Sequence, residues 1–161
     1  MKIKFRNGNL LKAEEQYKVH QVNCRGRMDT GIAKQIKYQF PAVYQQYHNL
    51  FINADEDICR SYLGTIFPVV VEDQCIINLF GELECSQDNV RHTNYEAFYS
   101  GLEKLREYLY LMNSKSVAFP FKIGSGRGGG DWNVIIAMII SVFKHSNITI
   151  IFYKYDLKSI K

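Results

Sequence analysis

Prolines, long apolar runs and runs of one charge are scarce in this sequence. It has 3 prolines in 161 residues and is 47% hydrophobic, which argues against a disordered chain. No apolar run approaches the ~20 residues needed to cross a bilayer, and the N-terminus has no signal-peptide core. A chain of this length buries about two-thirds of its unfolded surface. We therefore predict a single domain over residues 1–161 that is soluble and cytoplasmic and makes no membrane contact.

Patterns that bind metals or carry redox chemistry are missing too. The 4 cysteines form no C-x-x-C pair, so they are expected to be reduced thiols. The 4 histidines fall on different predicted elements without an i,i+4 partner, so we expect no metal and no cofactor. The net charge of +4, without a Lys/Arg run, favours a small anionic ligand over a nucleic-acid backbone.

What the sequence does contain is an alternation of strand and helix patterns. Val-, Ile- and Phe-rich segments predict strands at Lys2–Arg6, Tyr17–Asn23, Gly64–Val71, Cys75–Phe80, Val117–Phe121 and Ile148–Tyr153. Helical spacing predicts helices at Gly31–Gln39, Ala42–Asn53, Asn94–Asn113 and Trp132–Lys144. Such an alternation indicates an α/β layered sandwich, in which ligands bind at the carboxyl ends of the strands.

Two of these helices carry start signals. Thr93-Asn-Tyr-Glu96 fits a capping box, in which the Thr93 hydroxyl would accept from an amide of the first turn. Asp131 precedes the last helix and is a favourable N-cap residue. That helix is apolar nearly all round, which predicts burial against the sheet.

A glycine-rich loop is the most informative feature of the chain. Phe121-Lys-Ile-Gly-Ser-Gly-Arg-Gly-Gly-Gly-Asp-Trp132 lies between a predicted strand and a predicted helix. Glycines let the backbone turn its amides inward, and the helix start adds unsatisfied donors and a positive dipole end. The sequence therefore predicts a phosphate-binding loop; a flexible surface loop is the alternative.

A second loop, Asn23-Cys-Arg-Gly-Arg-Met-Asp-Thr-Gly31, also joins a strand to a helix. Two such loops on one edge of a sheet could grip a diphosphate from opposite sides without a metal. A Walker loop is excluded, because Gly129 is followed by Gly130-Asp131 rather than by Lys-Ser/Thr. G-x-G-x-x-G is formally met by Gly124, Gly126 and Gly129, but too late in the chain for a dinucleotide fold.

The segment His20-Gln-Val-Asn-Cys-Arg-Gly-Arg-Met-Asp-Thr-Gly-Ile-Ala33 resembles the first ligand loop of macrodomains, which bind ADP-ribose. Asn78-Leu-Phe-Gly-Glu82, Arg91-His-Thr-Asn-Tyr-Glu-Ala97 and the glycine-rich loop follow in the same order as in that family. The sequence is most similar to the branch that holds ADP-ribose-1″-phosphate phosphatases, terminal ADP-ribose glycohydrolase and macrodomain antitoxins acting on ADP-ribosylated DNA. The resemblance implies a three-layer α/β/α sandwich with a mixed, about six-stranded central sheet.

The resemblance also implies roles for individual positions. Asn9 matches an Asp that binds the adenine amino group, with Leu10 beside it, and Tyr153 could stack on adenine or pack at the edge of the core. The positions expected to bind the ligand through the two loops are Met28, Thr30, Gly31, Ile123, Gly124, Ser125, Gly126, Arg127, Gly128 and Gly129.

The catalytic candidates follow from the same comparison. Asn23 would orient the distal ribose. His20, Asp29, His92 and Asp131 could position the attacking water, although His20 could equally be a core histidine and Asp131 only a helix cap. Glycohydrolase relatives use a Lys after the fourth strand and an Asp in the glycine-rich loop, and this sequence has neither.

These departures disfavour a lysine-adduct mechanism and slightly favour a binding module, whereas the resemblance of the loops to those of the phosphatases favours catalysis. We expect the protein to bind ADP-ribose and to hydrolyse ADP-ribose-1″-phosphate to ADP-ribose and phosphate, without a metal. A non-catalytic ADP-ribose-binding module and a hydrolase that removes ADP-ribose from protein or nucleic acid are the alternatives. Nucleic acid is expected only as an ADP-ribosylated substrate.

Overall fold

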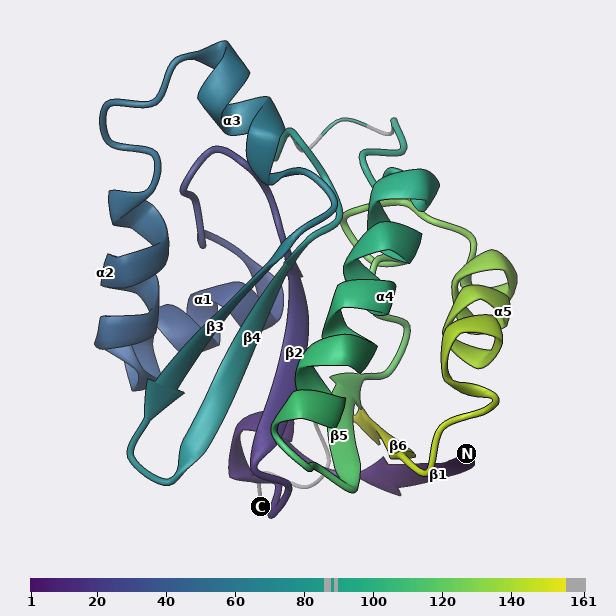
Figure 1. Ribbon diagram of the computed structural model, residues 1–161. Helices are drawn as coiled ribbons and strands as arrows, with labels where there is room; N and C mark the ends of the chain where they lie inside the picture. Colours follow the sequence, from purple (N-terminus) through teal and green to yellow (C-terminus); the bar gives the residue numbers. More distant parts are fainter. Residues whose placement is uncertain (86–87, 89, 156–161) are drawn as a thin grey trace.

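A six-stranded sheet forms the centre of the molecule (Figure 1). The computed structural model describes residues 1–85, 88 and 90–155. The strands are β1 (Lys2–Asn7), β2 (Tyr17–Val22), β3 (Ile66–Val71), β4 (Gln74–Phe80), β5 (Ser116–Pro120) and β6 (Thr149–Lys154). Their order across the sheet is β1-β6-β5-β2-β4-β3; β3 is antiparallel to β4 and the other pairs are parallel. The predicted mixed sheet is confirmed, and strand ends shift by one or two residues.

Helices cover both faces of this sheet, as Figure 1 shows. They are α1 (Gly31–Gln39), α2 (Pro41–Asn49), α3 (Glu56–Tyr62), α4 (Tyr95–Leu111) and α5 (Trp132–Phe143), with a short 3-10 helix η1 (Leu10–Lys12). α4 and α5 pack on one face, and α1 and α2 on the other. The predicted three-layer α/β/α sandwich is confirmed. Within the described residues, no helix is long and apolar enough to cross a membrane.

The central strand β2 shows why the sheet is buried on both sides. Tyr17 and Val19 belong to the core cluster under α4 and α5. Val22 packs into the opposite cluster with residues of α1 and α2. Successive side chains of a strand point to opposite faces, so both rows of β2 side chains are covered, and the polar members must find hydrogen-bond partners inside the protein. The buried Lys18 is tolerated because its ammonium donates to the Glu15 carbonyl (2.8 Å) and to Gln74 Oε1 (2.9 Å).

α3 is the element that sequence patterns missed. Only Cys59 is buried within its seven residues, so the segment has no apolar stripe that would indicate a helix. Its start is stabilised by Asp55, whose carboxylate accepts from the Ile58 amide at 2.9 Å. α2 ends at Asn49 rather than at the predicted Asn53, and residues 51–53 form turns.

The predicted cap of α4 is wrong. Asn94, not Thr93, is the N-cap residue, and its side chain accepts from the Ala97 amide at 3.0 Å. Thr93 lies one position earlier, where its hydroxyl donates to the Gly124 carbonyl at 2.7 Å. Thr93 therefore holds the glycine-rich loop in place instead of capping the start of α4. Asp131 does cap α5, because its carboxylate accepts from the Asn133 amide at 2.8 Å.

Candidate functional site

A cleft of about 540 Å³ opens at the carboxyl edge of the sheet, where β2, β4 and β5 end. Both loops singled out in the sequence border it. From the first loop and α1 it is lined by Asn23, Arg27, Asp29, Thr30, Gly31, Ile32 and Ala33, and from the glycine-rich segment by Lys122, Ile123, Gly124, Gly126, Arg127 and Gly128. The parallel pairing of β4, β2, β5 and β6 brings these strand ends to one edge.

The glycine-rich loop folds back on itself. Gly130 donates its amide to the Gly124 carbonyl (2.9 Å), and Gly129 donates to the Gly126 carbonyl (3.1 Å). Gly124 and Gly129 have φ values of +74° and +68°, where a side chain would be strained. Among the described residues, the amides of Gly124, Gly126, Arg127 and Gly128 donate to no protein acceptor. The loop thus keeps hydrogen-bond donors available beside the cleft, as anion binding requires.

The segment before α4 fixes this loop in place. The Gly128 carbonyl accepts from the amides of His92 (2.8 Å) and Thr93 (2.9 Å). The Thr93 hydroxyl donates to Gly124 and accepts from Gln21 Nε2 at 2.9 Å. Sequence reasoning found neither Gln21 nor this use of Thr93, because the contacts join residues 31 to 72 positions apart. Nothing local marks them.

Asn23 shapes the first loop from within. It is 5% exposed, and its Oδ1 accepts from the Arg25 amide (2.9 Å) and from the Tyr47 hydroxyl (2.8 Å). Its Nδ2 donates to the Arg27 carbonyl at 2.9 Å. Asn23 lines the cleft, yet these contacts hold the turn that directs Arg27 and Asp29 toward it. Its amide therefore organises the loop whether or not it also contacts a ligand.

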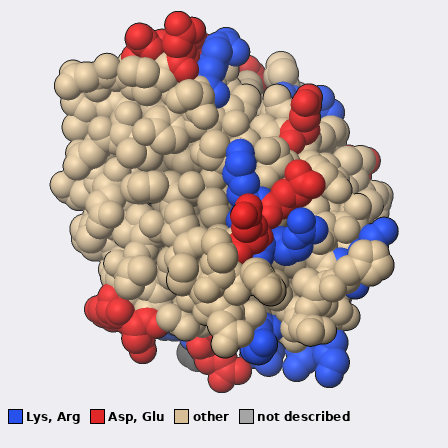
Figure 2. All heavy atoms as spheres, viewed as in Figure 1, with Lys and Arg blue, Asp and Glu red and all other residues tan. Residues whose placement is uncertain are grey.

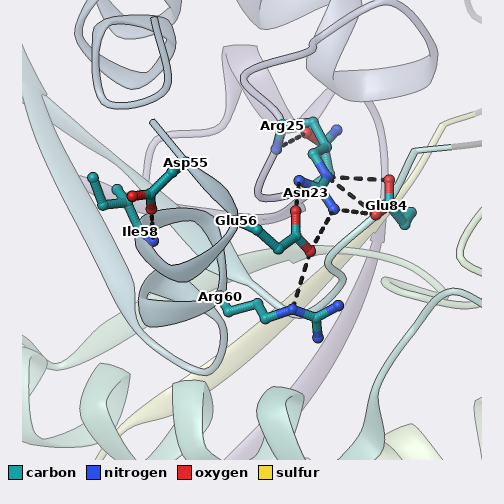
Figure 3. Close-up of polar contacts among 7 residues, drawn as sticks. All are labelled: Asn23, Arg25, Asp55, Glu56, Ile58, Arg60 and Glu84. Carbon is teal, nitrogen blue, oxygen red and sulfur yellow. Dashed lines mark hydrogen bonds and ion pairs between the residues drawn. The ribbon is translucent and has the colours of Figure 1, made fainter. Parts of the chain in front are cut away.

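An arginine clamp holds the outer side of the same loop (Figure 3). The Arg25 guanidinium pairs with Glu84 and, at 2.7 Å, with Glu56 at the start of α3. Arg60 in turn pairs with Glu56 at 3.0 Å. The two carboxylates raise the pKa of Arg25, whose hydrogen bonds to Glu56 lower the pKa of that carboxyl. Exposed ion pairs contribute little stability, so the effect of the clamp is to position the loop.

The catalytic candidates are not all at the cleft. Asn23 and Asp29 line it. His20 is fully buried on β2, where its Nε2 lies 2.6 Å from Asn78 Oδ1, and burial lowers its pKa to about 4. Asp131 caps α5 and does not line the cleft. His92 lies on the loop before α4 and contacts Asp88 through Nε2 at 2.6 Å.

Several expected ligand-binding residues are not among the described residues that line the cleft. Met28 is fully buried in the core under α1 and α2. Leu10 and Tyr153 pack in a small core cluster, and the Tyr153 hydroxyl donates to Glu15 Oε2 at 2.6 Å. Asn9 caps η1 by accepting from the Leu11 amide at 2.9 Å. Ser125 and Gly129 belong to the glycine-rich loop but do not line the cleft.

Glu82 is the residue that sequence reasoning passed over. It follows β4 by two positions, is half-buried and lines the cleft. Burial raises the pKa of its carboxyl to about 7, against the lowering effects of His92 and of a hydrogen bond from Gln21. Its place directly after a buried strand is the signal that could have identified it. Within the described residues, no group of three or more His, Cys, Asp or Glu side chains could hold a metal.

The sequence between residues 19 and 139 matches the family model described as the Macro domain. This chain belongs to the macro domain family. Its fold agrees, because the solved macrodomain of Mycobacterium tuberculosis DarG matches with a TM-score of 0.79 and 26% identity. That match covers 94% of this macro domain and 96% of the other chain. The macrodomain of Thermus aquaticus DarG matches with a TM-score of 0.75 and 25% identity over 94% and 97%.

Curated relatives of this macro domain are longer proteins. A protein named DNA ADP-ribosyl glycohydrolase from Mycobacterium tuberculosis is 28% identical over 151 residues, or 88% of this chain. A protein of the same name from Thermus aquaticus is 30% identical over 131 residues, or 81% of this chain. The chain spans 39% and 34% of these relatives, respectively.

Proposed function

We propose that this macro domain binds ADP-ribose in the cleft and hydrolyses ADP-ribose-1″-phosphate to ADP-ribose and phosphate. The main support is the pair of strand-to-helix loops that line one cleft from two sides. Four main-chain amides of the glycine-rich loop have no acceptor among the described residues of the protein. Such amides suit the oxygens of a diphosphate.

Charge and helix geometry support the same ligand. Arg27, Lys122 and Arg127 line the cleft from its two sides. α1 begins at Gly31, directly at the cleft, so its unsatisfied amides and positive dipole end face the same space. Together these groups would offset the negative charge of a diphosphate bound in the cleft.

A second candidate reaction is the removal of ADP-ribose from DNA. The names of the curated relatives favour it, and a solved DarTG of Thermosipho africanus is described in complex with ADP-ribose. One feature of this chain favours the phosphatase instead. Glu82 lies in the segment where the resemblance implies a lysine for glycohydrolases. On the face in Figure 2, acidic and basic side chains lie close together over α4, so this one face carries no basic stripe for a nucleic-acid backbone.

The test combines one binding and two turnover measurements on the whole chain. Titration calorimetry with ADP-ribose, with and without EDTA, should give the same micromolar affinity. Phosphate release from ADP-ribose-1″-phosphate should exceed the rate at which ADP-ribose leaves an ADP-ribosylated oligonucleotide. Faster release from the oligonucleotide would favour the glycohydrolase, binding without either product would indicate a non-catalytic module, and no binding would refute the proposal.

A further inference from the structure

Glu82 occupies a position that the established family membership does not explain. β2 and β4 are parallel and end together with Val22 opposite Phe80, so Cys24 and Glu82 each lie two residues beyond the paired ends of these strands. Its side chain lines the cleft together with Asn23 and Gly124. Carboxylates at the carboxyl end of a parallel sheet lie where ligands bind.

The backbone around Glu82 is held from both sides. Glu82 forms an antiparallel bridge with Thr93, and the Asn94 amide donates to the Gly81 carbonyl at 2.8 Å. On the other side the Cys24 amide donates to the Leu83 carbonyl at 3.1 Å. A carboxyl on so constrained a segment is pre-organised, because little chain entropy remains to be lost when it meets a substrate.

The preceding Gly81 shows how tightly this region is built. A Cβ at Gly81 would collide with Gln21 Oε1 and would lie 3.0 Å from Phe98. Gln21 Oε1 is itself buried without a hydrogen-bond partner in the described structure. The Gln21 amide therefore fills the space between Gly81 and the glycine-rich loop, and its Nε2 donates to the Thr93 hydroxyl at 2.9 Å.

The charge environment of Glu82 differs from that of its neighbour Glu84. Glu84 is exposed and paired with Arg25, whereas Glu82 has no Lys or Arg within ion-pair distance among the described residues. The titratable groups around Glu82 are His92 before α4, Cys24 after β2, and Tyr47 on α2. Arg27 and Asp29 line the same cleft from the first loop.

This environment keeps the proton on Glu82 near neutral pH. Burial raises the pKa of Glu82 to about 7, and a phosphate dianion bound in the cleft would raise it further by like-charge repulsion. A carboxyl that is neutral at working pH can approach a phosphate ester and donate a hydrogen bond to it. An ionised carboxylate at the same place would repel the substrate.

We propose that Glu82 is the proton donor in the hydrolysis of the 1″-phosphate. Water attacks phosphorus, the P–O1″ bond breaks, and its electron pair remains on O1″, which takes the proton of Glu82. The attacking water passes one proton to a phosphoryl oxygen, so inorganic phosphate leaves and Glu82 regains its proton from solvent. This inference rests on the proposed function, since it requires the distal ribose to lie at the Glu82 end of the cleft.

The experiment compares Glu82→Gln with Glu107→Gln, the same chemical change on the exposed face of α4. Phosphate release from ADP-ribose-1″-phosphate is measured from pH 5.5 to 9, and ADP-ribose binding by calorimetry. Glu82→Gln should bind ADP-ribose within about threefold of the parent but lower kcat by about 100-fold or more. Above the pKa of Glu82, kcat of the parent should fall about tenfold per pH unit. The Glu82→Gln variant should not show this alkaline fall in kcat. Glu107→Gln should match the parent in every measurement.

Each outcome decides between the two proposals. A parent that does not bind ADP-ribose refutes the proposed function itself. A parent that binds ADP-ribose but releases no phosphate refutes the proposed hydrolysis, and the role of Glu82 with it. A pH profile that is flat above pH 6, or a Glu82→Gln variant with kcat within threefold of the parent, overturns the role of Glu82 alone. Should Glu82→Gln fail to fold, Glu82→Asp provides the test. It should be slower but keep the alkaline limb, and loss of that limb would count against the proton-donor role.

Discussion

Gly128 offers a direct test of how the glycine-rich loop is built. Its φ is outside the left-handed region, so backbone strain does not require glycine there. Glycine is required because there is no space for a side chain. A Cβ at Gly128 would collide with the Thr93 hydroxyl and would lie 2.8 Å from both Gln21 Nε2 and the Gly124 carbonyl. Gly128→Ala must therefore displace the loop or the Thr93–Gln21 pair that braces it.

The magnitude follows from what is displaced. Overpacking a fixed site costs about 1–3 kcal/mol. Moving the loop also weakens the two amide bonds from His92 and Thr93 to the Gly128 carbonyl, each contributing about 1 kcal/mol. We expect Gly128→Ala to lower the free energy of unfolding by about 3 kcal/mol. For a domain of this size, that corresponds to a fall in Tm of roughly 6–12 °C.

Gly126→Ala is the matched control, because a Cβ at Gly126 meets no atom within 4 Å and its φ is also outside the left-handed region. Urea unfolding of both variants gives the stability difference, and calorimetry with ADP-ribose reports on the loop amides. Gly126→Ala should unfold within about 0.5 kcal/mol of the parent. Gly128→Ala should also bind ADP-ribose at least tenfold more weakly, a loss of about 1.4 kcal/mol. Equal stability of the two variants would refute the packing argument.

Two further predictions concern stability. Burial lowers the pKa of His20 to about 4 from its ordinary value of 6.5, so only the unfolded state takes up a proton between these pH values. The contribution of His20 to the free energy of unfolding should be complete above pH 6.5 and decline by up to about 3 kcal/mol as the pH falls to 4. In urea unfolding at several pH values, His20→Gln should flatten this pH dependence. A variant with the same pH dependence as the parent would contradict the prediction. Asp131→Ala removes the acceptor for the Asn133 amide and should cost about 1 kcal/mol. Asp131→Asn should recover most of that loss in thermal melts, and equal Tm values for the parent and the alanine variant would exclude a stabilising cap.

Much of the fold was predictable because its signals are local. The apolar stretches of β4 and β5 indicate strands covered on both faces, and the apolar stripe of α4 has helical spacing. α3 has neither signal, because Cys59 is its only buried residue. The helix therefore depends on the tertiary packing of the face that carries Cys59. Short helices without a stripe are not visible in periodicity alone.

The candidate site was predictable only in part, for a related reason. Glycine spacing and strand-to-helix position identify both loops, because turn geometry is encoded within a few residues. The partners that hold the glycine-rich loop, Gln21 and Thr93, come from other parts of the chain and leave no pattern in their own surroundings. The local signal at Thr93 even misleads, because a cap and a loop brace have the same sequence appearance.

The amino-acid sequence by itself determined the alternation of strands and helices, the two glycine-bearing loops and the family, since all of these rest on order and spacing along the chain. The tertiary structure alone decided which side chains reach the cleft. His20 is the neighbour of Gln21 on β2, but its side chain points to the opposite face of the sheet, where it is fully buried against Asn78. Glu82 acquires its raised pKa from burial by distant segments. Burial and charge environment depend on neighbours in space, and strand order, which sets those neighbours, is not written in any local pattern.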